Sequence, residues 1–329
     1  MVRMKVVALA GGVGGAKLVD GLTKILPDDA LTVIVNTGDD FDHFGLRICP
    51  DLDTVCYTWA GIANPETGWG RADESWNAMK DIEKLGGPTW FRLGDRDLAI
   101  HLERTRLLTE GKSLSEICHH FCSTWQIKHP VLPMSNDRVS TLVHSYEGDL
   151  PFQDYFVRRK CEPQVYGFDF IGADTAVPAP GVLDAMQAAD LIVICPSNPW
   201  VSIDPILAVP GTREALAGSR QGRGVIAVSP IIQGDTIKGP AAKMFREMGI
   251  SPSAASVASH YGSKRDGGLL SGYVFDVLDT NEQAAISKLG IHQKITNTIM
   301  KNQNDRIALA VEVIDFGRSL NPHLESEST

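Results

Sequence analysis

The fold is decided by residues 6–36, VVALAGGVGGAKLVDGLTKILPDDALTVIVN. An apolar strand, Val6–Ala10, runs into the glycine cluster Gly11–Gly15, and an amphipathic helical pattern follows. Pro27 ends that pattern, and a second apolar strand, Leu31–Val35, comes next. A strand, a glycine turn, a helix and a strand in so short a span predict the opening of a doubly wound parallel sheet.

The same order of elements returns late in the chain. Continuous apolar runs at Asp190–Cys195, Gly224–Val228 and Gly272–Leu278 predict further strands, and Pro240–Met248 predicts a helix. Unbroken apolar runs are typical of parallel strands that helices cover on both faces. We therefore predict an α/β fold with a Rossmann-like, doubly wound and mostly parallel sheet.

The middle of the chain, about residues 60–182, has a different pattern. Helical periodicity at Trp76–Leu85 and Leu98–Glu110 predicts a largely helical insertion that covers the ligand edge of the sheet. We expect residues 1–329 to form a single nucleotide-binding α/β domain, with a polar, frayed tail after Asn321.

Composition excludes several classes of protein. Lys and Arg total 31 against 40 for Asp and Glu, a formal charge of −9, so the broad basic surface that captures nucleic acid is not expected. No stretch approaches the roughly 20 apolar residues of a membrane span, and the first apolar run is too short for a signal peptide. These features predict a cytoplasmic protein with neither a membrane nor a nucleic-acid partner.

The six cysteines contain no C-x-x-C pair, which fits reduced cytoplasmic thiols. Cys118 and Cys122 are four residues apart and share a helix face, with His119, His120 and His129 nearby. Two interpretations of this cluster remain open: a metal site, or a helix with buried thiols. The missing second ligand pair at zinc spacing favours buried thiols.

The glycine cluster is the first candidate for ligand binding, since ligands of open parallel sheets lie beyond the carboxyl ends of the strands. Gly11, Gly12, Gly14 and Gly15 let the backbone approach phosphate oxygens, and Lys17 adds a charge at a helix N-terminus. The segment is neither a Walker loop nor a complete dinucleotide fingerprint, because Lys17 stands where the third glycine would be. A tight turn without a ligand is the alternative.

The second candidate, residues 36–54, reads NTGDDFDHFGLRICPDLDT and concentrates acidic side chains. Its aspartates are Asp39, Asp40, Asp42, Asp51 and Asp53. Grouped carboxylates suit a divalent ion that bridges phosphates, or a base for a hydroxyl nucleophile. The alternative is a solvated acidic loop.

Three further segments carry weaker signals. Arg92 and Arg96, in WFRLGDRD, suit an anion clamp or stacking on a flat ring, although an Arg–Asp surface pair is the more common explanation. Ser197 and Asn198 follow a predicted strand and suit hydrogen bonds to a base or ribose. The segment 229–243, SPIIQGDTIKGPAAK, adds lysines within reach of a phosphate.

Taken together, these segments resemble the 2-phospho-L-lactate transferase family of deazaflavin coenzyme F420 biosynthesis. The matching pieces, in chain order from residue 8 to about 262, are ALAGGVGGAKL, NTGDD, GLRICPDLDT, GWG, LGDRDLA, PSNPWVSIDPIL and SPII…KGPAAK. PDLDT together with LGDRD and the PSNP segment is far more specific than any glycine motif. Gln233 departs from the family, which usually has a second glycine in this loop.

The resemblance implies a reaction in which a guanosine diphospho-acid loses GMP while its phospho-acid moves to the ribityl hydroxyl of the deazaflavin FO. A divalent ion, Mg²⁺ or Mn²⁺, assists, and such chemistry depends on positioning and charge neutralisation. The acid remains open among 2-phospholactyl, phosphoenolpyruvyl and phosphoglyceryl groups. The family also suggests a homodimer.

The resemblance further implies roles for single residues. Asp53 and Arg92 match deazaflavin-contact positions, and we add Arg96 to that side of the site. We choose Asp39, Asp40 and Asp53 as metal ligands, with Asp40 and Asp53 as the catalytic acids. The diphosphate would lie on Gly11, Gly12, Gly14, Gly15 and Lys17, and the nucleoside near Ser197 and Asn198.

Two rival functions share the predicted sheet. One is an NAD(P)-dependent oxidoreductase, against which the missing third glycine and the acid-rich second loop both argue. The other is a sugar-nucleotide-binding regulatory protein without catalysis, which would need neither PDLDT nor LGDRD. Binding of FO distinguishes both from the transferase.

Overall fold

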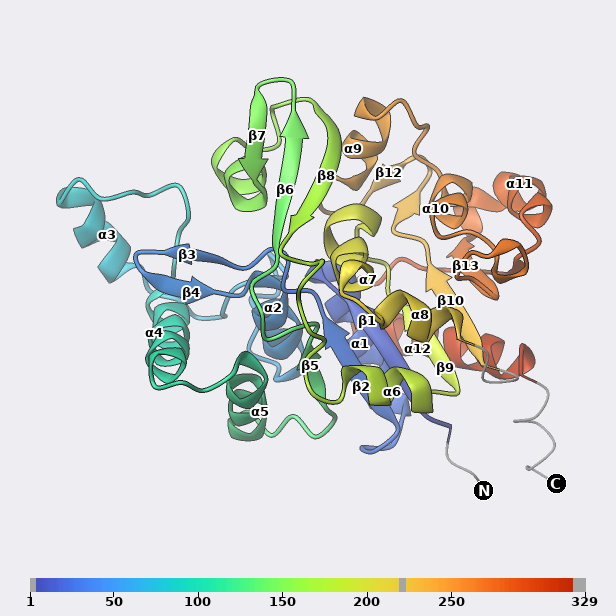
Figure 1. The fold of residues 1–329 in the computed structure, drawn as a ribbon, viewed down its shortest axis with the longest axis horizontal. Coiled ribbons are helices and arrows are strands. Elements are labelled where there is room, and N and C mark those ends of the chain that lie inside the picture. Colours follow the sequence, from blue (N-terminus) through green and yellow to red (C-terminus); the bar gives the residue numbers. More distant parts are fainter. Residues whose placement is uncertain (1–3, 219–222, 322–329) are drawn as a thin grey trace.

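The computed structural model describes residues 4–218 and 223–321 and contains a seven-stranded parallel sheet (Figure 1). The strand order is β14-β13-β10-β9-β1-β2-β5. The strands are β1 (Val6–Ala10), β2 (Leu31–Val35), β5 (Val131–Pro133), β9 (Leu191–Ile194), β10 (Gly224–Val228), β13 (Gly272–Asp276) and β14 (His292–Thr296). The predicted parallel α/β sheet is confirmed, whereas the predicted frayed tail lies outside the described residues from 322 onward.

Side chains of the central strands alternate between two apolar cores. Val6, Ala8 and Ala10 pack into one core, while Val7 and Leu9 pack into the other. The first core is covered by α1 (Gly12–Ile25), α2 (Pro50–Trp59), α5 (Leu114–Thr124) and α12 (Gln303–Ser319). The second is covered by α6 (Val182–Ala188), α7 (Asp204–Ala208), α8 (Thr212–Ala217), α9 (Ala241–Glu247), α10 (Ala254–Tyr261) and α11 (Gln283–Lys288). Burial on both faces explains the unbroken apolar runs in the sequence.

The order of the strands reverses at β1. On one side Val6 pairs with Leu31 of β2, and on the other side it pairs with Leu191 of β9. The loops that follow β1 and β9 therefore leave the sheet in different directions and open a crevice between them. In open α/β sheets this switch point is where ligands bind.

The middle segment combines helices with short strands (Figure 1). Its helices are α3 (Asn77–Lys84), α4 (Asp95–Thr109) and α5, and its strand β5 joins the edge of the main sheet. A separate antiparallel sheet consists of β6 (Ser140–Ser145), β7 (Gly148–Pro151) and β8 (Val165–Ile171). Two small hairpins complete the fold, one of β3 (Phe41–His43) and β4 (Leu46–Ile48), the other of β11 (Ile231–Ile232) and β12 (Asp235–Thr236).

The part of the chain that the structure describes holds no helix with the length and apolar character that a membrane crossing requires.

Candidate active site

A cavity of about 740 Å³ opens at the carboxyl ends of β1 and β9. Gly11, Gly12, Gly14 and Lys17 border it on the β1 side, with Pro196, Ser197 and Asn198 on the β9 side. The opposite wall comes from the middle segment and includes Thr67, Trp69, Gly70, Phe91, Arg92, Phe152 and Phe156. The cavity therefore spans the distance between the glycine turn and the aromatic residues of the middle segment.

The glycine turn is held against the loop after β9 by hydrogen bonds to Ser197. The Ser197 hydroxyl accepts from the Gly11 N–H at 3.2 Å and donates to the Gly11 carbonyl at 2.7 Å. A Cβ at Gly14 would lie 2.3 Å from the Pro196 carbonyl oxygen, and Gly12 has a φ of +62°. Glycine is therefore required here for close backbone approach and for a left-handed conformation.

Gly15 differs from its neighbours because it does not border the cavity. A Cβ there would lie 2.6 Å from the Ser197 hydroxyl and 3.2 Å from the Ala10 Cβ. Its observed role is to let α1 pack closely on β1 and the β9 loop, whereas the sequence placed it on the diphosphate.

Asp51 links the glycine turn to the end of β2. Its carboxylate accepts from the Gly12 N–H at 2.8 Å and from the Asn36 side-chain amide at 2.9 Å. Burial raises the pKa of Asp51 to about 6, against the effect of these two hydrogen bonds. The sequence predicted no individual role for Asp51. Its position next to Pro50, in the first turn of α2, was the signal that could have identified it.

Asp39 also borders the cavity, and its carboxylate interacts electrostatically with that of Asp51. Burial and the Asp51 carboxylate raise the pKa of Asp39 well above its usual value. Its Oδ1 atom is buried without a hydrogen-bond partner in the described structure. Two buried carboxylates that repel each other are suited to a hard divalent cation.

Asp53 belongs to a network of polar side chains that come from α2 and α4. Its carboxylate pairs with the buried Arg104 guanidinium, and Arg104 also contacts His101 Nδ1 at 3.0 Å. His101 Nε2 lies 3.4 Å from Asp97, which accepts a 2.7 Å hydrogen bond from the Tyr57 hydroxyl. Burial raises the pKa of Asp53 despite the arginine, and Asp53 Oδ2 has no hydrogen-bond partner among the described residues.

Tyr57, Asp97 and His101 border the cavity, although sequence analysis assigned none of them to the site. Asp97 and His101 are four residues apart on α4, so they share one helix face. The i, i+4 spacing of an acid and a histidine within LGDRDLAIHL was the signal that could have identified them.

Asp40 and Arg96 do not reach the cavity wall, which corrects their placement at the site. Asp40 is buried behind the wall with its carboxylate 3.4 Å from Arg47, and burial raises its pKa to about 7. Arg96 lies between Asp95 and Asp97 in the first turn of α4, so its side chain leaves the helix on a different face from that of Asp97 and His101.

The predicted metal set of Asp39, Asp40 and Asp53 is likewise not a compact cage. Their carboxylate oxygens do not all lie within 4.8 Å of one another. The two that border the cavity are Asp39 and Asp53.

The remaining predicted residues do border the cavity. Arg92 stacks its guanidinium 4.5 Å from the Trp76 ring centre. Lys17 donates to the Met300 carbonyl at 2.8 Å, and burial together with Arg306 and Lys238 lowers the pKa of its ammonium group. Positive charge is thus concentrated near the glycine turn.

The structure shows a capping hydrogen bond at Asn198 and an unusual backbone conformation at Gln233. The Asn198 side chain accepts from the Trp200 N–H at 3.1 Å and so caps the turn after β9. Gln233 adopts a φ of +51°, in the region that favours glycine. Glycine would adopt this conformation without strain, and Gln233 itself does not border the cavity.

The sequence matches the family model for 2-phospho-L-lactate transferase CofD over residues 6–314. The chain belongs to this family. A phosphoenolpyruvate transferase from Streptomyces griseus is 42% identical over 323 residues, covering 96% of this chain and 99% of that protein. A phosphoenolpyruvate transferase from Kitasatospora aureofaciens is 46% identical over 294 residues, covering 88% of this chain and 90% of that one.

The fold also resembles solved structures. A crystal structure of a UPF0052 family member from Bacillus halodurans matches with a TM-score of 0.62 at 15% identity, covering 95% of this chain and 99% of that chain. At this identity the likeness concerns the fold alone. Membership of the CofD family, by contrast, makes the chain a phospho-acid transferase of coenzyme F420 biosynthesis. This finding argues against both rival functions, the oxidoreductase and the non-catalytic regulatory protein.

Proposed function

We propose that this enzyme transfers a phosphoenolpyruvyl group from a guanosine diphospho-acid donor to the ribityl hydroxyl of FO, releasing GMP. The observation that carries the proposal is a single cavity bordered by the glycine turn at one end, by Arg92 and aromatic rings at the other, and by Asp39, Asp51 and Asp53. The names of the relatives favour enolpyruvate over the lactate and glycerate analogues.

The donor diphosphate is placed at the glycine turn. The α1 N-terminus directs its dipole and first-turn N–H groups into the cavity, which favours an anion. The Gly11 and Gly12 N–H groups already have acceptors in Ser197 and Asp51, so the later first-turn amides and Lys17 remain for phosphate oxygens.

The deazaflavin is placed against the middle segment. Trp69, Phe91 and Phe156 supply apolar surface for a flat ring, and the Arg92 guanidinium supplies a cation that stacks on aromatic faces. The ribityl chain would then extend towards Asp53, between the aromatic end and the glycine turn.

Asp39 and Asp51 would hold the Mg²⁺ or Mn²⁺ ion. Their buried carboxylates fit such a cation because the free Oδ1 of Asp39 and the mutual repulsion of the pair both call for a positive charge. Mg²⁺ characteristically takes one or two protein carboxylates and completes its shell with water and phosphate oxygens. The ion would supply charge neutralisation at the diphosphate.

Asp53 is the residue we propose to accept the ribityl proton. Its Oδ2 accepts no hydrogen bond and lies 3.8 Å from His101 Nδ1, and its raised pKa brings the carboxylate closer to the working range of a general base. The ribityl oxygen then bonds to the phosphorus that carries the acid, and the phosphorus–oxygen bond to GMP breaks. Arg104 holds Asp53 in place throughout.

Product analysis with the three donors tests the proposal. The protein is incubated with FO, Mg²⁺ and each guanosine diphospho-acid, and products are separated by chromatography and mass spectrometry. We expect the enolpyruvyl donor to have the highest kcat/KM. A lactyl or glyceryl donor that reacts faster would refute the choice of acid.

Acceptor placement is tested by Arg92→Ala, with Arg96→Ala as the matched control because Arg96 does not border the cavity. We expect Arg92→Ala to weaken FO binding about fivefold and GDP binding much less, since losing one cation–π contact costs about 1 kcal/mol. Fluorescence titration of FO and calorimetry of GDP measure both. Equal losses in the two variants, or an equal loss for both ligands, would contradict the placement.

Cytoplasmic localisation and a homodimer fit this function and stay predictions.

A further inference from the structure

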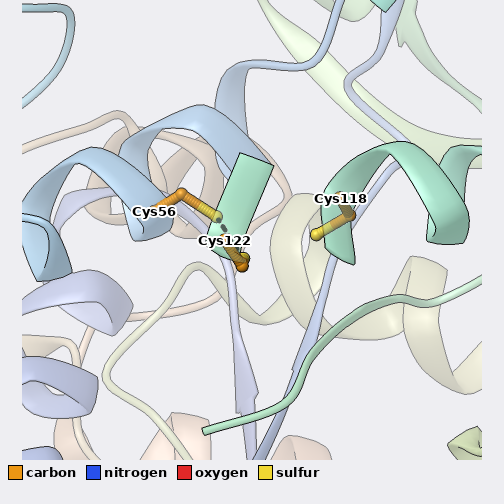
Figure 2. Close-up of side chains that lie close together, drawn as sticks. All are labelled: Cys56, Cys118 and Cys122. Atoms are coloured by element: carbon orange, nitrogen blue, oxygen red, sulfur yellow. Dashed lines mark hydrogen bonds between the residues drawn. The ribbon is translucent and has the colours of Figure 1, made fainter. Parts of the chain in front are cut away.

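Three cysteines from two helices, α2 and α5, lie close together in the interior of the protein. Cys56 lies on α2, while Cys118 and Cys122 lie one turn apart on α5. Their sulfur atoms all lie within 4.8 Å of one another, and the Cys56 and Cys122 sulfurs are 3.8 Å apart (Figure 2). All three residues are buried and reduced.

The spacing of these sulfurs matches a metal centre. With Zn–S bonds of about 2.3 Å, two thiolates of a tetrahedral zinc ion lie about 3.8 Å apart. Among the described residues, no other group of three or more His, Cys, Asp or Glu side chains converges this closely. Sequence spacing had suggested Cys118 and Cys122 with nearby histidines, and it missed Cys56 because that residue is far away along the chain.

We propose that Cys56, Cys118 and Cys122 bind a zinc ion that joins α2 to α5. Thiolates are soft ligands that select zinc or copper(I) over the hard Mg²⁺ of the catalytic site. Zinc fits better, because three thiolates leave a net charge of −1 around Zn²⁺ and of −2 around Cu⁺ in a buried position, where the lower charge costs less.

The surroundings provide for the remaining charge and the fourth ligand. A small cavity of about 10 Å³, large enough for one water molecule, is bordered by Cys56, Cys118, Asp53 and Arg104. Water in this cavity would complete a Cys₃ site, and the Arg104 guanidinium would face its negative charge.

Binding requires that the thiols lose their protons. Hydrogen bonds from the Cys118 and Cys56 thiols lower the pKa of Cys122. Hydrogen bonding within the cluster and burial raise the pKa of Cys56 and Cys118, and Cys118 donates weakly to the Val131 carbonyl at 3.4 Å. Zinc would displace those two protons and that bond.

A zinc ion at this site would help to position Asp53. Cys56 is three residues after Asp53 on α2, one turn along the helix, so an ion held by Cys56 would fix the turn that carries the proposed base. The cysteines would act through Asp53 and would not touch the substrate.

Metal analysis of the full-length protein tests this proposal. The protein is produced in zinc-supplemented medium and purified without oxygen, and its metal content is measured by mass spectrometry. We expect one zinc ion per chain, retained in the buried-cysteine control Cys195→Ala and lost in Cys56→Ala and in Cys122→Ala. Circular dichroism checks that each variant is folded.

Cobalt substitution gives a readout that is independent of activity. Co²⁺ in the wild type should show intense thiolate charge-transfer absorption, which should disappear in Cys122→Ala while persisting in an Asp39→Asn variant of the catalytic site. Three free thiols with no bound metal, a Cys56–Cys122 disulfide, bound copper, or zinc retained in both cysteine variants would each overturn the proposal.

Discussion

Asp53→Asn should cost stability as well as activity, because it leaves a buried guanidinium without its counter-charge. The Asp53 and Arg104 side chains are only 9% and 3% exposed. Losing one member of a buried ion pair costs about 3–5 kcal/mol. Arg104 keeps two other partners, His101 Nδ1 at 3.0 Å and the Arg47 carbonyl at 3.2 Å, so we expect the lower limit, about 3 kcal/mol.

Chemical denaturation and calorimetry measure this change. At about 2 °C for each kcal/mol in a chain of this size, the melting temperature should fall by about 6 °C. Turnover should be lost even at temperatures where the variant is fully folded. The control is Asp42→Asn, which changes an acid of β3 whose side chain is 47% exposed and should alter stability by less than about 0.5 kcal/mol.

A double-mutant cycle separates the ion pair from other effects. Arg104→Met alone leaves Asp53 unpaired, whereas the double variant Asp53→Asn/Arg104→Met removes both charges and should recover about 2 kcal/mol or more of the summed losses. A coupling energy below about 0.5 kcal/mol would refute the argument that this pair is what holds Asp53 in place.

Three further predictions concern the glycine turn, the loop after β11 and the acids. Gly14→Ala should abolish GDP binding in calorimetry, since its Cβ would lie 2.3 Å from the Pro196 carbonyl oxygen; unchanged affinity would contradict this. Gln233→Gly should raise the unfolding free energy by about 0.5 kcal/mol, because relief of the left-handed strain exceeds the entropy cost of glycine. The pKa values of about 7 for Asp40 and about 6 for Asp51 exceed those of the unfolded chain, so metal-free stability should fall as pH rises from about 4 to 7. Mg²⁺ favours ionised carboxylates, so its stabilising effect in thermal shift assays should grow over the same range, and a flat response would argue against a metal at Asp51.

The sheet was readable from the sequence because its strands are buried on both faces. β1, β9 and β10 each appear as an unbroken apolar run, and the glycine cluster marks where the first strand turns into α1. Polar clusters at strand ends also predicted the edge of the sheet at which the cavity opens, since the topology of a parallel sheet brings those ends together.

Contacts between distant segments could not be read in the same way. Asp51 caps Gly12 across 39 residues, and Cys56 lies 66 residues before Cys122, with no local pattern to indicate either contact. Asp40 looked equivalent to its neighbours, yet the backbone turns its side chain towards Arg47. Which acids of a cluster face a cavity depends on tertiary packing, which spacing alone does not specify.

The position of β1 inside the sheet, between β9 and β2, has a consequence for synthesis. Lys5 and Asp190, at the start of the β1–β9 pairing, are 185 residues apart. At about 5–20 residues per second, a ribosome needs roughly 10–40 s to deliver β9 after β1 has emerged. During that interval β1 can pair only with β2, and its other edge stays open. A nascent chain that stalls before β9 is therefore a candidate for chaperone binding. Such a chain has not yet formed the crevice between β1 and β9.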